Sequence, residues 1–200
     1  MLPQRKEALA MLEEASVLNP GPWFHHSLVA ADCAEKIAAR CPGLNAEKAY
    51  ILGLLHDIGR RYGFSYLRHV IDGYDYLMAL GYEEAAKICL SHSFDIKDLS
   101  SYVGKQDVTQ EQKDRILQFL QTAVYDDYDR LIQVCDSIAM PHGPVDMETR
   151  MMDVKKRYGS YPQDKWKKHL ELKRYFEEKA GMELDSMVSC AVSSQENRQG

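Results

Sequence analysis

Hydrophobic residues recur every three to four positions along most of the 200-residue chain, and no segment alternates convincingly between polar and apolar residues. This spacing matches the turn of an α-helix, whereas the residues of a strand repeat every two positions. The pattern therefore predicts an all-α protein, and no internal repeat is visible. The expected helices cover residues 3–18, 23–40, 46–58, 66–80, 82–92, 109–122, 126–139, 147–158 and 165–180.

The ends of several helices carry residues that favour a start or a stop. Asn45 is a candidate N-cap for the helix at residues 46–58, and Gly59 is expected to end that helix. Thr109 and Gln112 have the spacing of a capping box. Residues 94–108 lack a helical period and are expected to form a long loop, a kind of segment that is often functional.

The length suits one large domain with a well-buried core. We place this domain at residues 1–185, with C-terminal helices at about 147–181 and a disordered tail at 186–200. The formal net charge of -5 argues against nucleic acid and anionic membranes as partners. No run approaches the roughly 18 apolar residues of a membrane span, and the first residues are too charged for a signal peptide. Five scattered cysteines without a C-x-x-C pair are typical of a reducing compartment, so we expect a cytoplasmic protein.

Several histidines and aspartates lie on the apolar faces of the expected helices. His26 precedes Val29 and Ala30 by one helical turn, and His56 follows Leu52 by one turn. A buried imidazole or carboxylate is costly unless a hydrogen bond or a metal ion compensates, and helical bundles build metal sites from facing side chains. An isolated pair is often an ordinary core pair, but five such residues on four helices favour a metal site. They are His26, His56, Asp57, His92 and Asp136.

His25 is an alternative to His26. Val29 lies one helical turn after His25 as well, so the helical period alone does not separate the two histidines.

These residues occur in a recognisable order. His26-Ser27-Leu28-Val29-Ala30, then Leu54-Leu55-His56-Asp57-Ile58-Gly59, then Asp136, resemble the HD-domain superfamily of metal-dependent phosphohydrolases over about residues 23–140. The resemblance implies an HD-domain-like multi-helix bundle with a metal site in its core, and it selects His26 over His25. It implies that one metal ion is bound by His26, His56, Asp57 and Asp136. Arg60 is a departure, since the family often has lysine there.

A binuclear branch of the superfamily has two further histidines, the first in a His-x-x-x-Gly pattern. His69 with Gly73, followed by His92, is similar to that arrangement. The branch implies that Asp57 bridges two ions and that His69 and His92 complete the second site. A mononuclear site is the alternative, because His69 lies off the main apolar stripe of its helix.

The ligand types point to the chemistry. Imidazoles with carboxylates suit iron or manganese, with nickel, cobalt, zinc and magnesium as alternatives. A divalent ion lowers the pKa of bound water, which gives a hydroxide nucleophile, and it polarises a phosphoryl oxygen. Asp57, at the centre of the motif, is our candidate catalytic residue. Arg60, Arg61 and Arg68 are candidates for binding phosphate oxygens, although each could be a solvated arginine. No general acid is identified.

The expected function is therefore hydrolysis of a small phosphorylated molecule, which the family suggests is a nucleotide. A mixed-valent di-iron oxygenase of the same superfamily and a non-catalytic regulatory domain are the alternatives. The lysine-rich helices at 147–158 and 165–180 are expected to pack on the core or to form a homo-oligomer contact, without a catalytic role.

Overall fold

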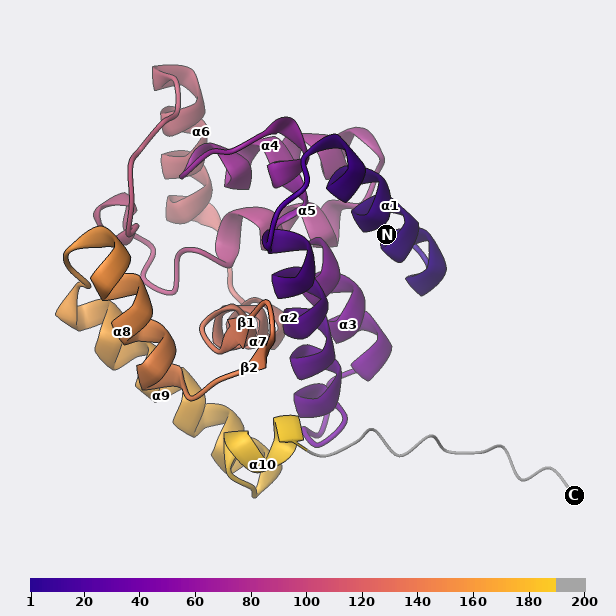
Figure 1. Ribbon diagram of the computed structural model, residues 1–200, viewed down its shortest axis with the longest axis vertical. Helices are drawn as coiled ribbons and strands as arrows, with labels where there is room; N and C mark the ends of the chain where they lie inside the picture. Colours follow the sequence, from indigo (N-terminus) through magenta and orange to yellow (C-terminus); the bar gives the residue numbers. More distant parts are fainter. Residues whose placement is uncertain (190–200) are drawn as a thin grey trace, which may run out of the picture.

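The computed structural model describes residues 1–189 and is almost entirely helical (Figure 1), which confirms the predicted all-α class. The α-helices are α1 (Arg5–Leu18), α2 (Trp23–Ala38), α3 (Ala46–Leu55), α4 (Arg68–Ala79), α5 (Glu83–Ser91), α6 (Gln110–Thr122), α7 (Asp127–Asp136), α8 (Met147–Tyr158), α9 (Gln163–Ala180) and α10 (Leu184–Ser189). The short elements are the 3₁₀ helices η1 (Ile58–Tyr62) and η2 (Leu99–Ser101) and the strands β1 (Ala139–Met140) and β2 (Gly143–Pro144).

Helices α2 and α3 form the centre of the bundle, and α7 packs against both. Small residues bring α2 and α3 close together: a Cβ atom added to Gly53 would lie 2.8 Å from the Cα atom of Ala31. Ala30 and Ala31 are fully buried at this contact. The close approach brings the first turn of α2 near the end of α3, where the histidines of both helices lie.

The expected helix starts are confirmed. The Asn45 side chain accepts a hydrogen bond from the backbone N–H of Lys48, 2.8 Å away, and Thr109 forms both bonds of a capping box with Gln112. A second capping box, between Asp126 and Asp129, begins α7. These bonds satisfy backbone donors that the first turn of a helix leaves without partners.

Gly59 has a different role from the predicted one. Helix α3 already ends at Leu55, and Gly59 lies inside η1 with a φ angle outside the left-handed region. A Cβ atom at this position would overlap the backbone oxygen of His69 and the backbone nitrogen of Gly73. Glycine is therefore required because η1 and α4 meet backbone to backbone, and this contact holds His69 beside the His56-Asp57 segment.

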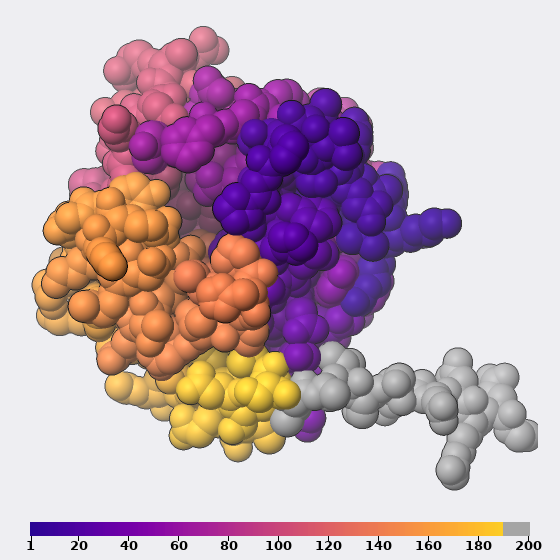
Figure 2. All heavy atoms as spheres, in the orientation of Figure 1, coloured from indigo at the N-terminus to yellow at the C-terminus, as the bar shows by residue number. Residues whose placement is uncertain are grey.

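The C-terminal helices cover one side of the bundle, as the orange and yellow surface of Figure 2 shows. Helix α10 was not predicted, and it buries Leu184, Met187 and Val188, so the predicted domain boundary at residue 185 falls inside a helix. The rest of the predicted tail, residues 190–200, lies outside the described residues. Within residues 1–189, no helix has both the length and the apolar character needed to cross a membrane.

Candidate metal centre

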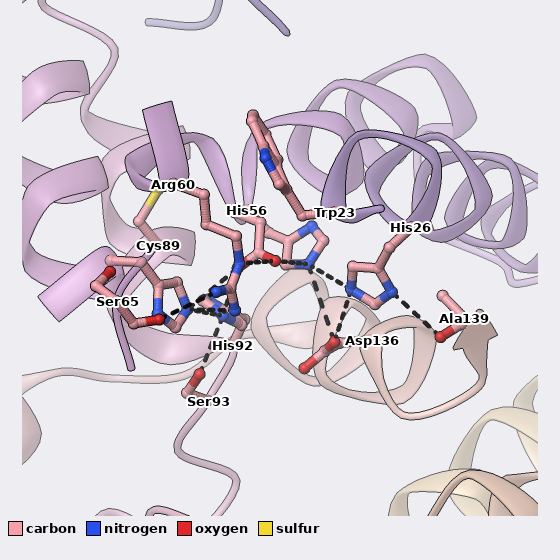
Figure 3. A network of polar contacts seen from close by, with 12 residues as sticks. Trp23, His26, His56, Arg60, Ser65, Cys89, His92, Ser93, Asp136 and Ala139 are labelled. Atoms are coloured by element: carbon pink, nitrogen blue, oxygen red, sulfur yellow. Dashed lines mark hydrogen bonds and ion pairs between the residues drawn. The ribbon is translucent and has the colours of Figure 1, made fainter. Parts of the chain in front are cut away.

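Five helix ends meet at one buried point. The first turn of α2 carries His26, the end of α3 is followed by His56 and Asp57, and α4 begins with His69 in its first turn. His92 follows α5, and Asp136 is the last residue of α7. In Figure 3, His26, His56, His92 and Asp136 point toward one another from different helices. The structure thus brings together all six residues that the sequence suggests as ligands, which we call the His/Asp cluster.

One half of the cluster surrounds His26. Its Nε2 atom lies 3.2 Å from His56 Nε2 and 3.0 Å from Asp136 Oδ1. His56 Nε2 also lies 3.9 Å from Asp57 Oδ2 and 4.0 Å from Asp136 Oδ1. His56 is completely buried. His26, His56 and Asp57 therefore offer ligand atoms to one position, and Asp136 lies beside both imidazoles.

The other half of the cluster surrounds the second oxygen of Asp57. Asp57 Oδ1 lies 3.1 Å from His69 Nε2 and 3.7 Å from His92 Nε2, and these two nitrogens are 3.4 Å apart. Asp57 is thus shared: its ligand atoms are close to those of His26 and His56 in one group and to those of His69 and His92 in the other. A carboxylate between two sets of imidazoles has the geometry of a bridging ligand.

All four histidines are oriented by the backbone. The Nδ1 atom of His26 lies 3.1 Å from the carbonyl oxygen of Ala139, and those of His56 and His92 lie 2.7 Å and 3.1 Å from carbonyls one turn earlier. His69 Nδ1 contacts the carbonyl oxygen of Tyr66. A carbonyl oxygen only accepts, so each Nδ1 carries the hydrogen and each Nε2 presents a lone pair to the cluster.

Such lone pairs cannot hydrogen-bond to one another. In a buried site they repel unless a proton or a cation lies between them, and a divalent metal ion is the group that several imidazoles and carboxylates bind together. The donor set therefore fits divalent metal ions.

The protonation states suit the same conclusion. Burial by itself raises the pKa of the Asp57 carboxyl, but the Arg60 guanidinium, 2.6 Å away, holds it well below its usual range. Burial, with the neighbouring His56, lowers the pKa of His92 to about 3. A charged Asp57 carboxylate and a neutral His92 ring are the forms that bind metal ions.

The three candidate arginines lie in different places. The Arg60 Nε atom donates to Asp57 Oδ2 over 2.6 Å, and its guanidinium faces the cavity beside His69. Arg61 instead pairs with Glu14 and stacks on Tyr76, and Arg68 pairs with Asp72. Neither of these two lines the cavity. The structure thus brings only Arg60 to the cluster.

Two histidines that could compete with the cluster lie elsewhere. His25 is exposed and its ring contacts Phe24, so it is not part of the cluster. His142 is exposed in the turn between β1 and β2.

A cavity of about 640 Å³ opens onto the cluster. Its lining includes Trp23 and the segment 63–66, which carries the highly exposed Phe64. Helices α8 and α9 also line it, which was not predicted, although Met151 and Phe176 pack on the core as expected. The two helices contribute Arg150, Asp153, Arg157, Lys165 and His169, and the segment between them contributes Tyr161.

Lys165 and His169 are the residues that sequence reasoning missed. Both are buried, at 8% and 5% exposure. A local signal was present, since Lys165, His169, Leu172 and Phe176 recur at helical spacing on the buried face of α9. Two titratable side chains on an otherwise apolar face could have been recognised as an inward-facing pair.

The family model that matches the chain is the HD domain, over residues 23–140. This match covers more than half of the sequence. The chain belongs to the HD domain family. No curated protein and no protein of known structure matches it. All six residues of the His/Asp cluster lie within the HD domain, whereas α8, α9 and α10 follow it.

Proposed function

We propose that this HD protein is a phosphohydrolase that uses two divalent metal ions. One ion would be held by His26, His56, Asp57 and Asp136, and the other by Asp57, His69 and His92. The observation that carries the proposal is the position of Asp57, which lies between the Nε2 atoms of His26 and His56 on one side and those of His69 and His92 on the other.

Iron and manganese are the metals we propose, because both bind mixed imidazole and carboxylate sets. Magnesium prefers an all-oxygen shell and is less suited to four imidazoles. When bound, such ions lower the pKa of a water molecule and polarise a phosphoryl oxygen.

Arg60 is the residue that we assign to the phosphate group. Its Nε atom donates to Asp57 and its Nη1 atom donates to the backbone oxygen of Ser65 over 3.4 Å, while Nη2 lies 3.5 Å from His69 Nε2 and the residue lines the cavity. The Asn19 side chain donates to the backbone oxygen of Arg60 over 2.7 Å and so fixes the segment that carries it. A guanidinium fixed beside the cluster can bind phosphate oxygens through its planar array of donors.

A nucleotide is the substrate class that the family suggests, and two features support it. The cavity volume of about 640 Å³ lies within the usual range for sites of small organic ligands. Aromatic rings of Trp23, Tyr66, Tyr102 and Tyr158 line the same cavity, and such rings can stack on a planar base.

The test is release of inorganic phosphate from a panel of nucleotides and other phosphate esters by manganese- or iron-loaded protein under anaerobic conditions. We expect turnover without oxygen. Asp57→Asn should abolish it, whereas Asp114→Asn, which changes an exposed aspartate on α6, should not. Strict dependence on oxygen would replace the hydrolase with an oxygenase, and full activity of Asp57→Asn would contradict the proposal.

A further inference from the structure

Three cations of the C-terminal helices line the same cavity as the His/Asp cluster. We call Arg150, Arg157 and Lys165 the cationic wall. They belong to α8 and α9, so all three lie after the HD domain match. None of them takes part in the proposed metal centre, and their presence in the cavity needs its own explanation.

Lys165 is a buried ammonium with a free donor. Its Nζ atom donates to Asp95 Oδ1 over 2.6 Å and to the carbonyl oxygen of Ser93 over 2.9 Å. An ammonium group has three N–H donors, and within residues 1–189 these are its two hydrogen-bond acceptors, so one donor is left for a ligand in the cavity. The Ser93 hydroxyl also contacts His92 Nε2, 3.0 Å away, so one residue connects Lys165 to the cluster.

Asp95 holds the Lys165 ammonium in place from the side away from the cavity. Its side chain is fully buried and does not line the cavity, while both Lys165 and His169 do. His169 Nε2 lies 4.0 Å from Asp95 Oδ2, and its Nδ1 atom contacts the Tyr161 hydroxyl over 2.8 Å. Burial lowers the pKa of His169 to about 4, so the ring is neutral near pH 7. Among the cavity-lining residues of α8 and α9, the positive charge therefore comes from Arg150, Arg157 and Lys165 and not from His169.

The two arginines of the wall share one carboxylate. Arg150 and Arg157 each donate to Asp153 Oδ2 over 3.0 Å, which leaves one positive charge in excess. The Arg150 Nε atom is buried and has no hydrogen-bond partner among residues 1–189. A buried donor without a partner is costly, and a ligand oxygen would satisfy it.

The cationic wall is separate from the His/Asp cluster. Within residues 1–189, the hydrogen bonds and ion pairs of Arg150, Arg157 and Lys165 go to Asp153, Ser93 and Asp95 and to none of the six cluster residues. A phosphate group held at the cluster by Arg60 therefore leaves the free donors of the wall available. A second group with negatively charged oxygens would neutralise the excess charge of Arg150 and Arg157 and accept hydrogen bonds from Lys165 and Arg150.

We propose that the cationic wall binds a second oxyanion of the substrate, a phosphate or a carboxylate, in addition to the phosphate group at the His/Asp cluster. The inference rests on the proposed function and names its substrate class: small molecules with two separated anionic groups. The HD domain would hold the reacting phosphate, and helices outside that domain would select the remainder of the molecule.

Binding of simple probes to the manganese-loaded protein tests the wall directly. Propyl phosphate has one anionic group, propane-1,3-diyl bisphosphate has two phosphates, and 3-carboxypropyl phosphate replaces one with a carboxylate. We expect wild-type protein to bind a two-anion probe roughly tenfold or more tightly than propyl phosphate, because charged hydrogen bonds are gained. The two-anion probe that binds more tightly identifies the oxyanion as phosphate or carboxylate.

Variants test whether the cationic wall causes the preference for two-anion probes. Arg150→Met and Lys165→Met should each reduce the ratio of the two Kd values to near one. Lys165→Met leaves the Asp95 charge buried without its partner and could unfold the protein. The double variant Lys165→Met/Asp95→Asn removes both charges, so it tests the loss of Lys165 in a protein that still folds. Lys167→Met is the matched control, since Lys167 is exposed on the same helix and should leave the ratio unchanged.

Equal binding of all probes by wild-type protein would overturn the inference, as would an unchanged ratio in Arg150→Met and the double variant. Either result leaves the phosphohydrolase proposal intact if phosphate esters are still hydrolysed. Conversely, absence of hydrolysis by metal-loaded protein would count against the proposed function, while the Kd ratio would still test the wall.

Discussion

The Nε2 atoms of His26 and His56 lie 3.2 Å apart, although each ring already donates its Nδ1 hydrogen to a backbone carbonyl. The two atoms therefore face each other with lone pairs. The same relationship recurs between His69 and His92 at 3.4 Å. Binding of cations would convert both repulsive contacts into shared ligation, so metal binding should contribute strongly to the stability of this HD protein.

Metal binding should raise the melting temperature. A ligand at 100 times its Kd stabilises a folded protein by about 2.7 kcal/mol. We expect manganese to raise the Tm of chelator-treated protein, measured by scanning calorimetry, and His26→Ala to lose most of that rise. His25→Ala is the adjacent control and should keep it, because His25 is exposed outside the cluster. An equal rise in both variants would show that His26 is not a ligand.

His69 distinguishes two metal ions from one. Its Nε2 atom lies close only to the half of the cluster formed with Asp57 and His92. His69→Ala should therefore lower the metal content from about two ions per chain to about one, measured by elemental analysis after loading and dialysis. Retention of two ions would remove His69 from the site.

Gly59→Ala should destabilise the protein markedly. The added methyl group would overlap the backbone of α4, which cannot move away as a flexible side chain could. Overpacking of this kind typically costs about 1–3 kcal/mol, and a backbone clash belongs at the upper end or beyond. Gly43→Ala is the comparison, since its methyl group meets no atom within 4 Å and only the positive φ of 83° opposes it. Urea unfolding measures both, and equal losses would contradict the proposed contact.

Acid should weaken the metal-free protein. The pKa values of His92 and His169 are lowered by burial to about 3 and about 4, whereas unfolded histidine has a pKa near 6.5. Between about pH 6.5 and 4 the unfolded chain thus binds more protons than the folded one, and the free energy of unfolding falls as the pH falls. Each histidine contributes up to about 1.4 kcal/mol per pH unit.

Urea unfolding of chelator-treated protein at pH 7, 6 and 5 measures this slope. His169→Gln removes one of the two histidines without touching the His/Asp cluster, so its stability should fall less steeply with decreasing pH. A slope identical to that of the wild type would show that folding does not lower the pKa of His169.

Helical periodicity was enough to predict the all-α class and to direct His56, Asp57, His92 and Asp136 toward the core. The choice of His26 over His25, and the inclusion of His69, came from the resemblance to the HD-domain superfamily. What was missed depends on contacts between distant parts of the chain. The buried face of α9 shows that Lys165 points inward, but its partner Asp95 lies 70 residues earlier, and no local pattern predicts that pairing. Arg60 and Arg61 are adjacent and chemically identical, and only packing directs the first to Asp57 and the second to Tyr76.

Periodicity also could not predict the shortest helices and strands. Helix α10 spans 6 residues, and β1 and β2 have 2 residues each, so none contains enough repeats to reveal its period. The role of Gly59 was mistaken for a related reason: glycine after a helix usually marks its end, and the backbone of α4 that excludes a side chain here comes from residues 69–73.

The most direct test of the two-metal centre is the number of transition metal ions per chain in protein purified without added metal and then loaded with manganese or iron, measured by elemental analysis. Close to two ions per chain, with Asp57→Asn losing both, is the expected result because Asp57 belongs to both halves of the cluster. No bound ion in the wild-type protein, even after loading, would contradict the account and leave His56 and Asp57 as an ordinary buried pair.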